Sequence, residues 1–556
     1  MKKTFFTLTF AFIAIFSSLA CTSLLVGKKA SVDGSVMITY SADAYDVYGE
    51  LYYNPKGKFD PKAKMEMYDW ETGRYLGPIQ QVAQTNNMVG YINDHQLCLG
   101  ETTFGGRPEL QDTTGIMDYG NMIFLALQRA KTAREAIKVM TDLVEEYGYY
   151  SSGESFSIAD KNEIWIMEMI GKGVGRKGAV WVAVRIPDDC IAAHANQSRI
   201  HQFPLNDPEN CIYSKDVISF AREMGYYSGS DKDFSFANAY NPLDWGGLRF
   251  CEARVWAFYN KYAEEDAKQW IPYVLGQDPT PMPLYVKPKE KISLKNVMDM
   301  MRDHYEGTPF DPTQDIGAGP YHSPYRFNPL SFELDGKKYG FERPISTQQT
   351  AFSFVGQMRN YLPDEIGGVL WFGTDDANLS IYTPMYGCMT NIPDCYRVGT
   401  GDMTTFSWQS SFWINNWVAN MTYPRYNQIL PDIREAQKGL EGKFLAEQNE
   451  KEKEFAALLK TNRDEAIKQI TNYSIETAQA YFDKWKKMGE YIIVKYADGV
   501  IKKEETFSEG EKTLKRFKKS EYNGAEYPNR PLLDEEFLRQ IIREKGDWLE
   551  QKDIKY

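Results

Sequence analysis

Residues 21–40 read Cys-Thr-Ser-Leu-Leu-Val-Gly-Lys-Lys-Ala-Ser-Val-Asp-Gly-Ser-Val-Met-Ile-Thr-Tyr. One apolar stretch covers Thr22 to Gly27, a second covers Val36 to Tyr40, and Asp33-Gly34 lies between them. An Asp-Gly pair between two apolar runs favours a tight hairpin turn. We therefore predict a β-hairpin that begins immediately after Cys21.

The residues before Cys21 have the pattern of an export signal. Two lysines precede an apolar run from Phe5 to Phe16 that is too short to span a bilayer. Small residues, Ser18 and Ala20, occupy the positions that signal peptidase prefers before a cut at Cys21. We predict a signal peptide over residues 1–20, an exported protein that is periplasmic or secreted, and no stable membrane insertion after cleavage. The alternative is a lipoprotein signal, in which an acylated Cys21 anchors the protein to lipid.

Composition limits the class of protein. The 556 residues include 64 Lys+Arg and 76 Asp+Glu, which gives a formal net charge of −12 and argues against a nucleic-acid partner. Hydrophobic residues make up 43% of the chain, enough to bury a large core and to exclude disorder as the main state.

The first half of the chain alternates between strand and helix patterns. Turn-flanked strands are predicted around residues 88–100, and an apolar period of 3.6 follows from Asp118 to Tyr147. Capping-box spacing from Thr132 to Glu135 divides that region into two helices. Consecutive strands are then predicted over residues 155–159, 163–170, 179–186 and 191–195.

The second half is more varied. Residues 204–344 are rich in Pro, Gly and Asn and predict surface loops with one helix near residues 294–305, and strands are predicted over residues 347–358 and 366–372. From about Tyr426 the composition shifts to Lys, Glu, Ala and Gln, which favours helices, with a short strand at residues 491–496. We therefore divide the chain into three parts: a signal peptide (1–20), a hydrolase domain (21–425) and a helix-rich extension (426–556).

Two sequence patterns do not indicate a cofactor. Gly173-Val-Gly-Arg-Lys-Gly178 matches a dinucleotide fingerprint, but an alternating strand follows it instead of a helix, so we predict a hairpin. The five histidines lie outside recognisable zinc spacings, and no metal or organic cofactor is predicted. The seven cysteines leave disulfide pairing open, although the spacing of Cys388 and Cys395 would allow a disulfide across one loop.

Cys21 is the residue that is most clearly suited to catalysis. Cleavage before it would create a free α-amino group, which titrates near pH 8 and can act as a base beside the thiol. One residue would then supply both nucleophile and base, as in N-terminal nucleophile hydrolases. The alternative is a structural cysteine, the usual role of cysteine in exported proteins.

The start of the mature chain, Cys21 to Ser35, resembles the dipeptidase A family of cysteine peptidases, which are related to choloylglycine hydrolases and penicillin V acylases. Further similarities lie at residues 90–106 (GYINDHQLCLGETTFGG), 193–200 (AHANQSRI) and 248–256 (LRFCEARVW). The resemblance implies an α+β fold, the αββα sandwich of N-terminal nucleophile hydrolases with two antiparallel sheets, followed here by a charged helical C-terminal extension.

The resemblance also implies roles for single residues. Cys21 matches the nucleophile, and Asp43 matches an aspartate that holds the amine of the cysteine. Asn196 matches an asparagine that stabilises the oxyanion. Arg254 matches a late active-site arginine that would lower the pKa of the thiol, with Arg249 as the competing candidate.

Two positions depart from the pattern of the family. Tyr40 stands where many relatives have an arginine, and Thr103 falls near the second oxyanion asparagine of the acylases. The second oxyanion donor would therefore be the hydroxyl of Thr103 or a backbone N–H of the loop at residues 101–103.

Together these observations predict an exported cysteine dipeptidase that hydrolyses short peptides through a thioester on Cys21. One alternative is an amidase of the same fold that acts on conjugated bile salts or N-acyl amino acids. The other is a non-catalytic lipoprotein acylated at Cys21. A short peptide is the predicted partner, and a homo-oligomer is compatible with the sequence.

Overall fold

The hairpin predicted after Cys21 lies at the centre of a large antiparallel sheet. In a computed structural model that describes residues 21–326, 330–499, 501–510, 512–517 and 535–552, strand β1 (Ser23–Val26) pairs with β2 (Val36–Asp43), with Leu25 opposite Ile38. Every residue of both strands is buried. Among the described residues this sheet runs in the order β14 (Tyr285–Val286), β12 (Ile191–His194), β1, β2, β17 (Thr350–Met358), β18 (Gly368–Thr374) and β19 (Thr383–Tyr386).

A second antiparallel sheet is built mainly from the predicted strands of the first half. Its longest strands, β8 to β11, follow one another as neighbours, and the glycine-rich stretch near Gly173 joins β10 to β11 as the predicted hairpin. In the described part of the chain its order is β13 (Cys211–Tyr213), β11 (Ala179–Ile186), β10 (Ile164–Gly171), β9 (Gly153–Ala159), β8 (Cys98–Gly105), β7 (Ile92–Asn93), β6 (Met88–Val89) and β3 (Tyr53–Asn54).

The two sheets pack against each other through their inner strands. Strand β2 contacts β8 and β9, and β1 contacts β8. The side chains between them are apolar apart from a small set of polar groups near Cys21. Since Cys21 lies immediately before β1, the packing of the sheets places its thiol between the two layers, against β8.

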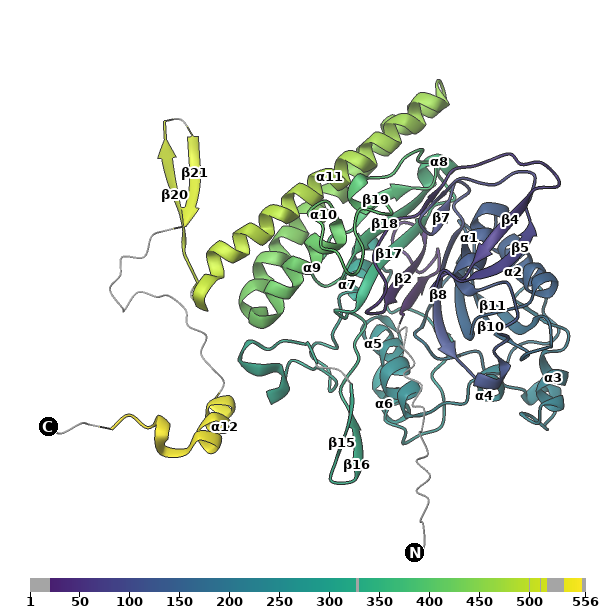
Figure 1. The fold of residues 1–556 in the computed structure, drawn as a ribbon, viewed down its shortest axis with the longest axis horizontal. Helices are drawn as coiled ribbons and strands as arrows, with labels where there is room; N and C mark the ends of the chain where they lie inside the picture. Colours follow the sequence, from purple (N-terminus) through teal and green to yellow (C-terminus); the bar gives the residue numbers. More distant parts are fainter. Residues whose placement is uncertain (1–20, 327–329, 500, 511, 518–534, 553–556) are drawn as a thin grey trace, which may run out of the picture.

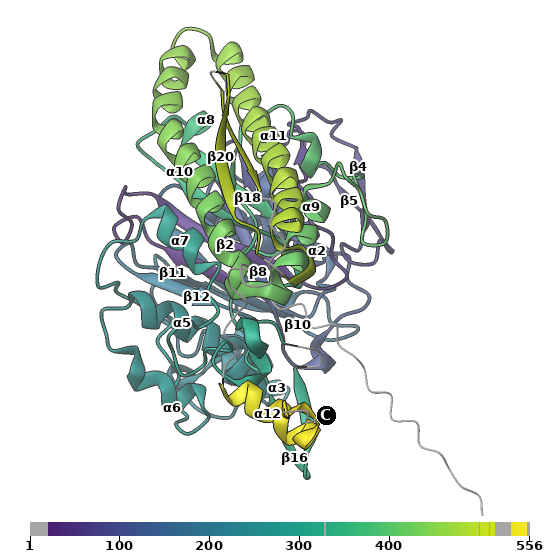
Figure 2. The ribbon, with the colours of Figure 1, turned by 90° about the vertical axis from the view of Figure 1, so that its left-hand side faces the viewer.

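Helices cover the outer faces of both sheets (Figures 1 and 2). Helices α1 (Tyr119–Arg129) and α2 (Ala133–Tyr147) confirm the predicted pair, and Asp118 and Thr132 cap their N-termini. Both helices contact the β8–β11 sheet. The other sheet is covered by α9 (Ser411–Thr422), α10 (Tyr426–Leu459) and α11 (Arg463–Tyr496), and the last two lie side by side as a long helical pair.

Buried ion pairs fix α10 to the body of the molecule. Arg302 bonds both carboxylate oxygens of Glu441, and Arg359 bonds both oxygens of Glu452 at 2.7 Å. The predicted strand at residues 491–496 is wrong, because these residues form the last turns of α11 and bury only one helical face, that of Ile492 and Tyr496. The division of the chain at residue 425 stays a prediction.

The region predicted as loops, residues 204–344, contains more helix than expected. Its described helices are α3 (Val217–Glu223), α4 (Phe236–Tyr240), α5 (Ala253–Tyr262), α6 (Ile271–Val274) and α7 (Leu294–Met300), and a hairpin of β15 (Ser331–Leu334) and β16 (Lys337–Gly340) follows. Short helices separated by Pro and Gly leave little periodicity for sequence reasoning to detect.

The remaining described elements are peripheral. They are the hairpin β4 (Lys64–Tyr68) with β5 (Tyr75–Gln80), α8 (Asp364–Gly367), the hairpin β20 (Glu504–Glu509) with β21 (Lys512–Phe517), and α12 (Glu535–Lys545). None of the helices described here is long and apolar enough to cross a membrane. The predicted signal peptide lies outside the described residues.

Candidate active site around Cys21

The thiol of Cys21 faces a phenol and a carboxyl group in the space between the sheets. Cys21 is 1% exposed, and its Sγ lies 3.7 Å from Oε1 of Glu101 on β8 and 4.0 Å from the hydroxyl oxygen of Tyr40 on β2. Tyr40 donates a hydrogen bond of 2.5 Å to the same Glu101 oxygen. Tyr40, a departure from the pattern of the family, is therefore part of the site.

The electrostatic environment of Cys21 disfavours the thiolate. Burial raises the pKa of the Cys21 thiol, and the negative charges of Glu101 and Asp43 raise it further. The guanidinium of Arg254 contacts the main chain of Cys21 and not its sulfur, and its predicted effect on the thiol pKa stays a prediction. A base is therefore needed to take the thiol proton.

Asp43, at the end of β2, is held by three side chains. Its carboxylate accepts hydrogen bonds from Arg343 at 2.6 Å, Thr350 at 2.6 Å and Ser41 at 3.2 Å. The hydroxyl of Ser41 also accepts the backbone N–H of Thr22, which links Asp43 to the residue next to Cys21. The role of Asp43 toward the α-amine of Cys21 stays a prediction.

Sequence reasoning missed Arg343. It is 3% exposed and forms an ion pair with Asp43 across 300 residues of sequence. It supplies a cation near Asp43, although the arginine expected before that aspartate is replaced by Tyr40. No motif surrounds Arg343, so only the fold reveals its partner.

Arg254 joins the start of β1 to the end of β12. Its Nη1 donates to the carbonyl oxygen of Cys21 at 2.5 Å and to Oγ1 of Thr22 at 2.7 Å, and its Nη2 donates to Oδ1 of Asn196 at 2.9 Å. A π-helical turn, Gly247–Glu252, precedes it and leaves the Phe250 carbonyl oxygen to accept its Nε–H at 2.6 Å. Such turns are frequent at functional sites.

The competing arginine points elsewhere. Arg249 pairs with Glu342 and stacks on the ring of Phe310, with its guanidinium carbon 4.4 Å from the ring centre. Between the two candidates, the geometry therefore favours Arg254 as the arginine of the Cys21 site.

Asn196 and Thr103 also meet at this site. Asn196 follows β12 with a positive φ of 64°, a conformation that asparagine tolerates better than most residues. Its Nδ2 donates to the carbonyl oxygen of Thr103 at 2.8 Å. The hydroxyl of Thr103 donates to Glu154 at 2.9 Å. Both residues are thus within the network around Cys21, and their roles toward an oxyanion stay predictions.

Two glutamates that sequence reasoning did not single out complete the site. Glu101 on β8 and Glu154 on β9 are 0% and 1% exposed, and burial raises the pKa of both carboxyls, that of Glu101 to about 7. The signal was present in the sequence, because Glu101 interrupts a strand whose flanking residues are apolar or small. Charged side chains are almost never fully buried without a functional or structural partner.

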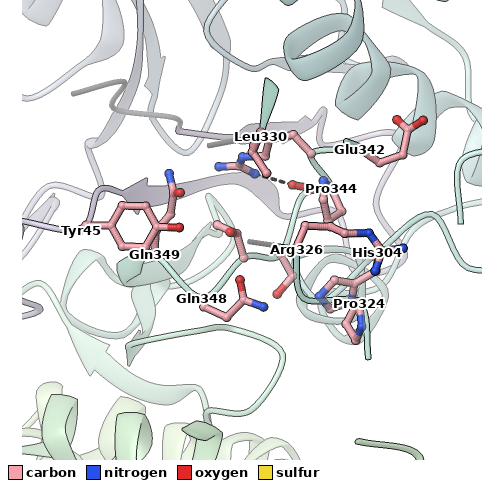
Figure 3. Close-up of a pocket in the computed structure, with 12 residues that line it drawn as sticks. Tyr45, His304, Pro324, Arg326, Leu330, Glu342, Pro344, Gln348 and Gln349 are labelled. Carbon is pink, nitrogen blue, oxygen red and sulfur yellow. Dashed lines mark hydrogen bonds between the residues drawn. The ribbon is translucent and has the colours of Figure 1, made fainter. Parts of the chain in front are cut away.

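Two surface cavities are lined by residues other than Cys21, and the smaller one lies beside Asp43. A cavity of about 20 Å³, room for about one water molecule, is lined by Arg343 and Gln349, and Gln349 also donates to the carbonyl oxygen of Asp43. Figure 3 shows Tyr45 and Gln349 on one side of it and His304 and Pro324 on the other. A larger open hollow of about 670 Å³ is lined in part by Arg185, and Cys21 lines neither of them.

The seven cysteines, all of which lie in the described residues, are unpaired. The disulfide that the spacing of Cys388 and Cys395 would allow is therefore not formed. The thiol of Cys388 instead donates to the carbonyl oxygen of Glu365 at 3.1 Å.

Comparison with known proteins agrees with the sequence motifs. The model of peptidase family C69 matches residues 20–72 and 59–439, which together span most of the chain. The chain belongs to peptidase family C69. The resemblance to the dipeptidase A family is thereby confirmed.

Several curated relatives of this C69 protein carry dipeptidase names. It is 28% identical over 425 residues to a probable dipeptidase of Salmonella dublin, covering 73% of this chain and 89% of that protein. It is 26% identical to a probable dipeptidase of Latilactobacillus sakei (76% and 85% covered) and 26% identical to dipeptidase A of Lactobacillus helveticus (79% and 89% covered).

Proposed function

We propose that this C69 protein is an exported dipeptidase of the N-terminal nucleophile type, with an αββα fold and Cys21 as nucleophile. The observation that carries the proposal is the placement of Cys21. Arg254 holds its carbonyl oxygen at 2.5 Å, and its thiol is enclosed between two sheets beside Tyr40 of β2 and Glu101 of β8. The dipeptidase names of the relatives support the substrate class.

The proposed reaction has two stages. The α-amine of mature Cys21 takes the thiol proton as Sγ attacks the scissile carbonyl carbon, and the carbonyl oxygen becomes an oxyanion. Asn196 and a second donor near Thr103 stabilise that oxyanion. The C–N bond then breaks, the leaving nitrogen takes the proton from the amine, and a thioester remains on Sγ. Water hydrolyses the thioester and restores the thiol.

The remaining neighbours position these groups. Arg254 fixes the carbonyl oxygen of Cys21 and the side chain of Asn196 relative to each other. Asp43, paired with Arg343, acts through Ser41 on the main chain beside the nucleophile. A rigid main chain at Cys21 keeps the sulfur and the amine on one side of the bound carbonyl.

The decisive experiment compares Cys21→Ala with Cys388→Ala in the exported, full-length protein. We expect Cys21→Ala to lower kcat/KM for alanyl-alanine by at least about 10³-fold while the circular dichroism spectrum is unchanged. Cys388→Ala, at a buried cysteine outside the site, serves as the matched control and is expected to keep its activity. Retained activity in Cys21→Ala would refute the proposal.

Two further measurements separate the alternatives. Mass spectrometry of the N-terminal peptide is expected to show an unmodified Cys21, whereas a diacylglyceryl group would favour the lipoprotein. Hydrolysis of alanyl-alanine is expected to exceed that of glycine- and taurine-conjugated bile salts. The reverse preference would favour the amidase.

A further inference from the structure

The buried carboxyls beside the thiol form a pair on adjacent strands. Glu101 on β8 and Glu154 on β9 lie close enough that the charge of Glu101 raises the pKa of Glu154. Oε1 of Glu101 accepts hydrogen bonds from Tyr40 and from the Cys21 thiol, and Oε1 of Glu154 accepts one from Thr103.

Each carboxyl keeps one oxygen that no other protein group reaches. Oε2 of Glu101 and Oε2 of Glu154 are both buried without another donor in the described residues, and the two carboxyls hydrogen-bond to each other, with the carboxyl of Glu154, whose pKa this contact raises, donating to Glu101. No lysine or arginine of the described chain forms an ion pair with either residue, whereas three other buried glutamates, Glu252, Glu441 and Glu452, each bind an arginine. A buried carboxyl pair without a cation is costly to ionise, so its retention beside a nucleophile points to a cationic ligand.

Distances identify which part of a peptide reaches this pair. During attack the scissile carbonyl carbon lies against Sγ, and the α-nitrogen of the same residue is about 2.5 Å from that carbon. Glu101 Oε1 lies 3.7 Å from Sγ. An α-ammonium group on the residue that donates the carbonyl can therefore reach Glu101 and the neighbouring Glu154.

We propose that Glu101 and Glu154 bind the α-ammonium group of the substrate, so that the enzyme cleaves after an N-terminal residue with a free amino group. The inference rests on the proposed function and names the determinant of its substrate class. The ammonium donates to oxygens of the carboxyl pair and supplies the cation that this buried pair lacks.

The main rival occupant is the α-amine of mature Cys21 itself. If Glu101 and Glu154 held that amine, their loss would slow reaction of Cys21 with every substrate and inhibitor. If they hold the substrate ammonium, their loss slows only compounds with a free α-amine. The test therefore compares two reagents that differ at that one group.

The probes are alanine chloromethyl ketone with a free amino group and its N-acetylated form, both of which alkylate an active-site thiol. The second-order rate constant for modification of Cys21 is measured by mass spectrometry in the exported full-length protein. We expect wild type to prefer the free-amine reagent by about tenfold or more and Glu154→Gln and Glu101→Gln to lose most of that preference.

Glu168→Gln is the matched control. Glu168 is also 0% exposed with a pKa raised to about 7 by burial, but it accepts from Ser198 and from the backbone of Arg199. This substitution is expected to keep the preference for the free-amine reagent.

An equal loss of rate with both reagents in the Glu101 and Glu154 variants would overturn the inference in favour of the α-amine of Cys21. An unchanged preference would overturn it as well. Wild-type protein that is alkylated at Cys21 but shows neither preference nor dipeptide hydrolysis would overturn the proposed function too, so the two failures are distinguishable.

Discussion

Two buried regions of this C69 protein hold glutamates in opposite ways. Under α10, Glu441 and Glu452 each receive a two-pronged hydrogen bond from an arginine, and Glu452 also accepts from Tyr386 at 2.9 Å. Beside Cys21, Glu101 and Glu154 pair with no lysine or arginine among the described residues, and their carboxyls hydrogen-bond to each other. In the first arrangement the protein itself supplies the cation that each buried carboxylate needs. In the second arrangement we infer that a ligand supplies it.

This difference separates a structural from a functional use of buried charge. A carboxylate with a bidentate arginine is satisfied, and it ties a helix to a sheet in one geometry. A carboxyl pair without a cation shifts toward the protonated state, as the pKa of Glu101 near 7 indicates. Perturbed groups of this kind concentrate at active sites.

The largest expected effect on stability concerns the arginine-paired glutamates under α10. Arg359→Ala leaves the buried carboxylate of Glu452 without its cation and is expected to lower the free energy of unfolding by about 3–5 kcal/mol. Urea unfolding measures this. Arg463→Ala, which breaks an ion pair whose arginine is half exposed, is the control and is expected to cost less than about 1 kcal/mol. Equal losses would remove the distinction between buried and surface pairs.

At the carboxyl pair beside Cys21, a substitution is expected to raise the free energy of unfolding. Glu101→Gln is expected to stabilise the substrate-free protein at pH 8, by up to about 3 kcal/mol, because the pKa of Glu101 is about 7 in the folded state against an ordinary value of 4.5. The folded wild type binds more protons than the unfolded chain between these values. Its free energy of unfolding should therefore fall as pH rises from about 4.5 to about 7 and then level off.

Urea unfolding at several pH values measures this fall in the free energy of unfolding. The contribution of Glu101 to it should be absent from the Glu101→Gln variant. The groups that act on Glu101 are Tyr40, Glu154, Cys21 and Glu71. Indistinguishable pH profiles for wild type and variant would show that Glu101 is already ionised in the free protein. The α-ammonium of Cys21 would then be its partner, which contradicts the contrast between the two regions.

The smallest expected effect concerns the phenol of Tyr40 and its influence on the pKa of Glu101. Tyr40 donates to Glu101 at 2.5 Å, and this hydrogen bond lowers the pKa of that carboxyl. Tyr40→Phe should raise the pKa of Glu101 further, by about one unit, and extend the pH range over which stability falls. The same unfolding series measures it. An unchanged range would mean that Tyr40 contributes packing rather than charge stabilisation.

Much of the fold was predictable because its strands and helices carry local signals. The Asp33-Gly34 turn placed the first hairpin, and Thr132 placed the start of α2. The short helices between residues 204 and 344 were not predictable, since each is stabilised by packing rather than by periodicity. Residues 491–496 show the same limit, because six apolar-rich residues fit a strand as well as the end of a long helix.

The sequence by itself determined the candidate nucleophile. The position of Cys21 after the predicted export signal, and the motifs around Asp43, Asn196 and Arg254, are local patterns, and the structure brings Arg254 and Asn196 into one network with Cys21.

Only the tertiary structure decided what surrounds the thiol. Arg343 meets Asp43 across 300 residues, and Glu101 and Glu154 meet because β8 and β9 pair in one register. The pKa of a carboxyl depends on burial and on neighbouring charges, which are properties of packing in three dimensions. For this reason the chain alone could mark Glu101 as an unusual strand residue, but it could not show that Glu101 and Glu154 meet without a cation or which substrate group we assign to them.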